Sequence, residues 1–166
     1  MSIDRRKFLF IVSTAGLAAS CGPRPATEKW PHHVGELVRC GWFSFNVLEV
    51  AYKSQLGEGT LASRARYGFL LIRLSITSGA GQSVWMPFLR LENGNGEMIG
   101  EVEDARAQPN WLGMLRRVEP GATETGWIVF DTAPAIYGLR LTDGVLDDEK
   151  TAMVRIPFQV ENSLKP

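Results

Sequence analysis

Histidine and cysteine, the residue types that most often carry out chemistry in proteins, are scarce in this chain of 166 residues. The only histidines are the adjacent His32 and His33. Consecutive side chains diverge on a strand, so these two predict solvated loop histidines rather than a shared metal site. A serine hydrolase needs a histidine that reaches its nucleophile, and a blue-copper centre needs a cysteine with two histidine ligands. We therefore expect no enzyme activity, no catalytic residues, no metal and no cofactor.

The first cysteine, Cys21, lies where a covalent modification is expected. The basic start Arg5-Arg6-Lys7 is followed by Phe8–Ala19, an apolar run of 12 residues. A membrane-spanning helix needs about 20 such residues, so the run is typical of a signal peptide. Leu17-Ala18-Ala19-Ser20-Cys21 then resembles the bacterial lipobox, whose cysteine is diacylglycerated on sulfur and becomes the mature N-terminus. Ala18 stands where that pattern usually has a larger aliphatic residue.

Asp4-Arg5-Arg6-Lys7-Phe8-Leu9 resembles the twin-arginine export motif, which implies that Arg5, Arg6, Phe8 and Leu9 form the export signal. We expect residues 1–20 to be the signal peptide and residues 21–38 to be a lipid-anchored tether. The protein would then be a membrane-anchored lipoprotein of the cell envelope, carrying acyl chains such as palmitate and facing the periplasm or the cell exterior. An ordinary signal peptide that happens to contain a cysteine is the alternative.

Charged side chains offer two further candidate sites. Glu103, Asp104 and Arg106 could serve an enzyme or a small-ligand carrier that uses carboxylates and arginines. Four acidic residues in 143–149 could bind calcium, but their spacing lacks the alternating ligands of an EF-hand and favours a solvated loop. Cys40, the second cysteine, is more readily explained as a packed thiol than as a reactive one. The formal net charge of zero gives no reason to expect a nucleic-acid partner.

The elements that would position these residues are predicted to be strands. In Tyr67–Thr77, Leu70, Ile72, Leu74 and Ile76 alternate onto one face, which is typical of a central buried strand. Gly41–Tyr52 changes phase near Val47 and Leu48, which predicts a β-bulge or a change of sheet. Thr151–Val160 alternates cleanly, and Pro157 favours an edge position for it.

Turns and loops complete the predicted domain, residues 39–162. Val84–Leu91 is expected to be an edge strand or to be broken at Pro87, and two Asn-Gly pairs in Asn93–Gly96 predict a hairpin. Lys53–Arg66 is expected to be a loop, whereas 103–117 could be a helical turn or a loop folded on the sheet. About seven short strands with turns between them favour an all-β, antiparallel two-sheet sandwich.

The order of these features resembles a family of bacterial lipoprotein and secreted-antigen domains with an immunoglobulin-like fold. The resemblance covers roughly two-thirds of the chain after Cys21 and implies fold rather than activity, because its motifs are turn and core positions. Members are mostly of unknown function, and the pattern implies no catalytic residues. The matching pieces are Phe45-x-Val47-Leu48-Glu49-Val50, Leu70–Ile76, Phe88-x-x-Leu91, Asn95-Gly96, Pro120-Gly121 and Gly126-x-x-Val129-Phe130-Asp131.

Two functional hypotheses follow. The first is a non-enzymatic interaction module that binds a protein or another envelope component through edge strands or loops. Trp85 and Trp111 lie near polar turns and are candidates for its exposed binding patch. The second is the enzyme or ligand carrier that uses Glu103, Asp104 and Arg106.

The N-terminal motifs make a testable prediction. Replacing Cys21 by Ala removes the thiol that accepts the lipid, so a fatty-acid analogue should label the wild type and not this variant. Replacing Arg5 and Arg6 by Lys keeps the charge but loses the forked guanidinium geometry, so precursor should accumulate in the cytoplasm while Cys21 remains intact. Label on the Cys21→Ala variant, or none on the wild type, would contradict the lipobox interpretation.

Overall fold

The computed structural model describes residues 28–59 and 62–158, so Arg5, Arg6, Phe8, Leu9 and Cys21 lie outside the described residues. The described residues form strands and no α-helix. The strands are β1 (His32–His33), β2 (Leu37–Cys40), β3 (Phe43–Leu56), β4 (Ser63–Ser78), β5 (Val84–Trp85), β6 (Arg90–Glu92), β7 (Met98–Gly100), β8 (Arg117–Val118), β9 (Thr123–Asp131), β10 (Tyr137–Thr142) and β11 (Thr151–Ile156).

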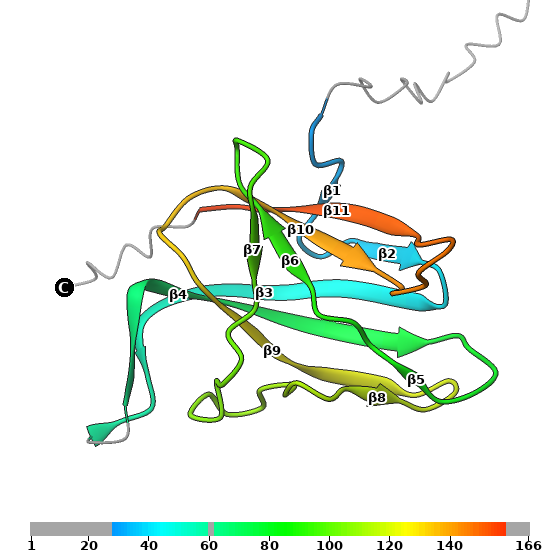
Figure 1. The fold of residues 1–166 in the computed structure, drawn as a ribbon, viewed down its shortest axis with the longest axis horizontal. Coiled ribbons are helices and arrows are strands. Elements are labelled where there is room, and N and C mark those ends of the chain that lie inside the picture. Colours follow the sequence, from blue (N-terminus) through cyan, green and yellow to red (C-terminus); the bar gives the residue numbers. More distant parts are fainter. Residues whose placement is uncertain (1–27, 60–61, 159–166) are drawn as a thin grey trace, which may run out of the picture.

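Two sheets form the layers of the fold (Figure 1). The five-stranded sheet has the order β1-β11-β10-β6-β7, and the four-stranded sheet has the order β2-β3-β4-β9. A small third sheet pairs β5 with β8. The pairings are antiparallel except for the short parallel pair β1–β11. The prediction of an all-β antiparallel sandwich is therefore confirmed.

β4 is the central strand that its alternation predicts. Leu70, Ile72 and Leu74 have no exposed surface, and Ile76 is also buried, in the core between the two sheets. The opposite face of β4 is covered as well, because Leu71 is buried in a second apolar cluster. β3 and β9 pair with the two edges of β4 between Phe69 and Thr77, so this part of the strand is central in its sheet.

The phase change in β3 is a β-bulge. The register passes from Val47 opposite Leu74 to Glu49 opposite Arg73, which leaves Leu48 as the extra residue. Val47 is buried, and Val50 beyond the bulge also packs against the core. One inserted residue thus keeps both halves of a long strand facing the same core.

Lys53–Arg66 is not the loop that its polar composition suggested. β3 continues to Leu56 and β4 begins at Ser63, and the two strands pair through Gln55 opposite Arg64. Leu56 is buried in the second apolar cluster. A projecting hairpin with polar side chains on most positions lacks the apolar alternation by which strands are recognised.

The predicted break and hairpin after β5 are both present. Pro87 lies between β5 and β6, in a stretch without strand structure. The Asn-Gly segment connects β6 to β7, and the Asn93 N–H donates to the Glu97 carbonyl at 3.0 Å. β11, however, is not the edge strand that Pro157 suggested, because β1 pairs along its outer side.

Part of the segment expected to be a tether belongs to the fold. Trp30 is only 8% exposed and packs on Gly138 of β10, where an added Cβ would lie 2.3 Å from Trp30 Nε1. The Lys29 ammonium donates to the carbonyls of Asn93 and Gly94 at 3.1 and 3.0 Å. The histidines form β1 and are half-buried rather than lying in a solvated loop. Long-range packing of this kind leaves no periodic pattern in a short proline-rich segment.

Replacing Trp30 by Ala should therefore destabilise the domain. We expect a loss of about 3 kcal/mol, the lower end of the range for buried tryptophans, because its Nε1 has no hydrogen-bond partner among the described residues. Urea unfolding measures the change, and Trp42→Ala is the matched control because Trp42 is 47% exposed. Equal losses in the two variants would mean that Trp30 does not anchor the N-terminal segment.

Candidate functional site

The sequence-based candidates that the structure brings together lie on one loop. Residues 101–116 connect β7 to β8 and run along the outer side of β9 (Figure 1). The Trp127 N–H donates to the Asn110 carbonyl at 2.8 Å, and the Leu112 N–H donates to the Trp127 carbonyl at 3.0 Å. Gly126 permits this approach, since a Cβ there would lie 2.5 Å from the Asn110 carbonyl oxygen. The segment undecided from sequence is therefore a loop folded onto the sheet.

Side chains of this loop line an open, shallow hollow of about 400 Å³, which we call the 103–115 hollow. Its lining combines a charged rim with an apolar wall, and Leu115 is 82% exposed at its border. The glutamate, aspartate and arginine proposed from sequence all contribute to it, together with one of the two candidate tryptophans. The lining residues are Glu103, Asp104, Arg106, Trp111, Met114 and Leu115.

Asp104 and Arg106 are bound to each other on the rim. The Arg106 side chain donates from Nε to Asp104 Oδ1 at 2.9 Å and from Nη2 to Oδ2 at 2.7 Å. These bonds, with a third from the Arg106 backbone N–H, lower the pKa of Asp104 to about 2. Both groups therefore keep their charges throughout the neutral range. The pair can attract polar or charged groups of a ligand, but Asp104 holds no proton to donate near neutral pH.

Trp111 lines the hollow and also packs against the second apolar cluster. It packs beside Ala105 and Trp127 on the outer face of the four-stranded sheet. Its Nε1 is buried and has no hydrogen-bond partner among the described residues. Trp111 therefore serves mainly to seat the loop, and it presents only part of its surface to the hollow.

Trp85 lies apart from the hollow. It is 60% exposed on β5, opposite Arg117 of β8. The structure thus does not unite the two tryptophans proposed from sequence in one lining. Leu115, which sequence reasoning did not select, takes the more prominent position because it borders both the 103–115 hollow and a second hollow of about 200 Å³.

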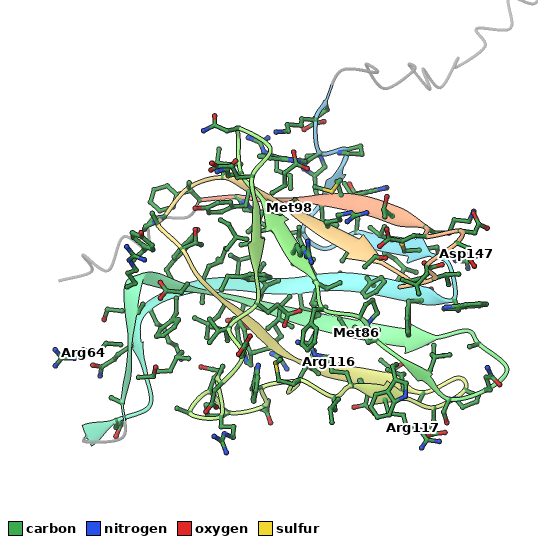
Figure 2. All side chains as sticks on the ribbon, in the orientation of Figure 1. Arg64, Met86, Met98, Arg116, Arg117 and Asp147 are labelled. Carbon is green, nitrogen blue, oxygen red and sulfur yellow. The ribbon has the colours of Figure 1, made fainter. Side chains whose placement is uncertain are left out.

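A buried ion pair, also not predicted, holds the loop in place. The Glu101 and Arg116 side chains are 2% and 4% exposed and form a two-pronged contact, one bond of which measures 3.0 Å. Glu101 also accepts a hydrogen bond from the Leu89 N–H at 2.7 Å. Figure 2 shows Arg116 beside Met86, whose backbone N–H donates to the Arg116 carbonyl at 2.8 Å. The pair therefore ties both ends of the loop to the strand break after β5.

Cys40 and Asp143, two further candidates, make structural contacts. Cys40 is buried and donates to the Lys150 carbonyl at 2.9 Å. Burial, with a contribution from the Asp143 charge, raises the pKa of the Cys40 thiol to about 11, as fits a packed thiol. Asp143 accepts hydrogen bonds from the N–H groups of Val145 and Lys150 within its own loop. In the described ranges, no cluster of three histidine, cysteine or acidic side chains is arranged to hold a metal ion.

The described residues also include no helix with the length and apolar character needed to cross a membrane.

No protein-family model and no curated protein matches this chain. Several solved structures resemble it, and at their low sequence identities the similarity concerns the fold alone. YjhA of Bacillus subtilis is 16% identical, with 74% of this chain and 98% of YjhA covered and a TM-score of 0.57. A protein of unknown function from Listeria monocytogenes is 10% identical, with 75% and 82% covered and a TM-score of 0.55.

A third similar structure, YcdA of Bacillus subtilis, is described as a candidate lipoprotein. It is 13% identical, with 72% of this chain covered and a TM-score of 0.54. The chain spans only 37% of that longer protein. Together the three structures show that this fold occurs in other bacterial proteins, and at these identities no functional residue is transferred from them.

Breaking the buried ion pair should destabilise the domain. Arg116→Ala should cost about 3–5 kcal/mol, because it leaves the Glu101 carboxylate buried without its partner. Arg117→Ala is the control, since the Arg117–Glu119 pair is 59% exposed on each side and should contribute less than about 1 kcal/mol. Urea unfolding compares the two.

A double variant, Arg116→Met with Glu101→Leu, should recover most of the loss because no charge is then buried alone. If Arg116→Ala and Arg117→Ala lowered the free energy of unfolding equally, the buried pair would not hold the loop.

Proposed function

We propose that this protein is a lipid-anchored component of the cell envelope whose β-sandwich binds a protein partner through the 103–115 hollow and its border. The observation that carries the proposal is the combination of an apolar wall, an 82% exposed Leu115 and a charged rim on a loop fixed to the sheet. An apolar centre within a polar rim is the usual composition of a protein–protein interface.

The adjoining edge of β9 favours an extended segment of the partner. β9 is the last strand of its sheet, and the loop is hydrogen-bonded to its outer side at Trp127 and Val129. Among the described residues, no strand or loop is hydrogen-bonded along that side between Thr123 and Thr125. Glu124 lines the second hollow, so this edge and Leu115 border the same depression. A partner strand could pair with the edge while a side chain enters the hollow.

The N-terminal attachment is compatible with access to this surface. Glu28, the first described residue, lies seven residues after Cys21, so the chain between them can span at most about 25 Å. In Figure 1 the first described residues lie beside β1, on the opposite side of the molecule from β8 and the 101–116 loop. An anchor at Cys21 would hold the domain close to the membrane with the hollow directed away from it.

The alternative, an enzyme or small-ligand carrier, would use the same hollow. It is favoured by the presence of Glu103, Asp104 and Arg106 in one lining. Proton transfer near neutral pH is better served by a carboxylate whose pKa is raised toward 7, whereas that of Asp104 is lowered to about 2. The fixed charges therefore support recognition over catalysis, and a carrier is the stronger form of this alternative.

Site-specific photo-crosslinking in the native envelope tests the proposal. A photoreactive phenylalanine analogue at position 115 should form a discrete adduct with a protein. The same analogue at position 146 should not, because Leu146 is 98% exposed on the distant β10–β11 loop and so controls for exposure. If neither position, or both equally, gave a protein adduct, the partner would not bind at this surface.

Once the partner is known, its affinity for the Leu115→Asp variant checks the energetic role of the residue. We expect about a thirtyfold loss, equivalent to about 2 kcal/mol, because a charge would replace an apolar contact between the two hollows that the partner covers. Leu146→Asp should leave the affinity unchanged.

A further inference from the structure

A separate pocket lies on the outer face of the five-stranded sheet, where the strand break after β5 meets the β10–β11 loop. It has a volume of about 220 Å³. We call it the arginine pocket, because two arginines face each other in it. Its lining residues are Pro87, Phe88, Arg90, Arg140, Thr142 and Glu149.

The register of the sheet places the two arginines together. Arg90 of β6 is directly opposite Arg140 of β10. The neighbouring pair, Leu91 opposite Leu139, is fully buried in the core. Because side chains alternate along a strand, Arg90 and Arg140 are directed outward. Directly opposed side chains have Cβ atoms about 5 Å apart, and like charges at that spacing destabilise a sheet. Negative charge nearby therefore stabilises two opposed arginines.

One carboxylate supplies part of that charge. Arg140 Nη2 lies 2.9 Å from Glu149 Oε2, and Thr142 Oγ1 donates to Glu149 Oε1 at 2.5 Å. The Thr142 hydrogen bond lowers the pKa of Glu149, and the two arginines lower it further, so Glu149 is ionised. Arg90 forms no ion pair within residues 28–59 and 62–158. The pocket therefore carries one uncompensated positive charge.

The apolar wall of the pocket is in contact with the buried ion pair. Phe88 lies under the Arg116 guanidinium, whose central carbon is 5.5 Å from the ring centroid. Arg116 is itself held by the buried Glu101 carboxylate. Pro87 lies next to the β10–β11 loop, since a Cβ added to Gly144 would lie 3.2 Å from the Pro87 side chain. The site is thus built on strands and a braced connection, which favours binding without rearrangement.

We propose that the arginine pocket binds a small oxyanion, a phosphate or a carboxylate group, with Arg90 and Arg140 as its donors. A planar guanidinium presents paired N–H groups that match two oxygens of such a group. The volume is below the roughly 300–1,000 Å³ typical of pockets for drug-sized ligands, so it suits a single anionic group. Glu149 occupies the Arg140 side of the pocket and competes with the incoming anion for this arginine.

Calorimetric titration of the full-length chain in dodecyl maltoside tests this site. The probes are inorganic phosphate, succinate and glycerol phosphate, each at constant ionic strength. We expect saturable binding that Arg90→Gln and Arg140→Gln weaken at least about tenfold. Arg64→Gln should change nothing, because Arg64 is an exposed arginine on the β3–β4 hairpin, far from the pocket (Figure 2). Melting curves confirm that each variant is folded.

Glu149→Gln provides a test that loss of folding cannot imitate. Removing the competing carboxylate should tighten binding several-fold, whereas Asp147→Asn, an identical change of charge in the same loop, should not (Figure 2). Tighter binding of glycerol phosphate than of phosphate would place the anion in a lipid headgroup, and the reverse order in a free ion. No saturable binding to any probe, or equal weakening by Arg64→Gln, would overturn the proposal.

Discussion

The buried contact between Glu101 and Arg116 is the constraint on which both proposed sites depend. It joins the two ends of the 101–116 loop and ties them to the strand break through the Leu89 N–H and the Met86 N–H. On one side this fixes the loop that forms the 103–115 hollow. On the other side the same guanidinium covers Phe88, which walls the arginine pocket. A buried pair of this kind is costly to desolvate, so its contribution is better seen in the geometry it specifies than in net stability.

The parts of the fold that could be predicted are those with a local signature. Alternation placed Leu70 and Ile72 in the core, and Asn-Gly pairs located the β6–β7 turn. The phase change near Val47 and Leu48 predicted either a bulge or a change of sheet, and the register shows the bulge. The parts that could not be predicted depend on distant partners. Trp30 is buried because Gly138, more than 100 residues later, leaves space for it, and nothing near Trp30 indicates this.

The candidate site shows the same division. Glu103, Asp104, Arg106 and Trp111 are close in sequence, and the structure brings them into one lining. Leu115 could not be distinguished from a core leucine, because the spacing in 103–117 fits a helical turn as well as a folded-back loop and so does not assign its faces. Pairs such as Arg90 with Arg140 arise from strand order, which pairs β6 with β10 although the two arginines are 50 positions apart in the sequence. Chemistry that depends on register is therefore hidden until the topology is known.

The parallel pairing of β1 with β11 links the first and last strands of the described chain. Trp30 also packs on β10, so the first described residues to be synthesised are held by the last strands to be synthesised. Ribosomes release a chain from its N-terminus, so residues 28–33 wait without their sheet neighbours while the four-stranded sheet can already form. Closing that long separation is slow, because the loop entropy must be paid before the contact forms. Translation through β11 is thus a physical precondition for the pairing of β1, and a chain that ends before β11 would leave β1 without its partner strand.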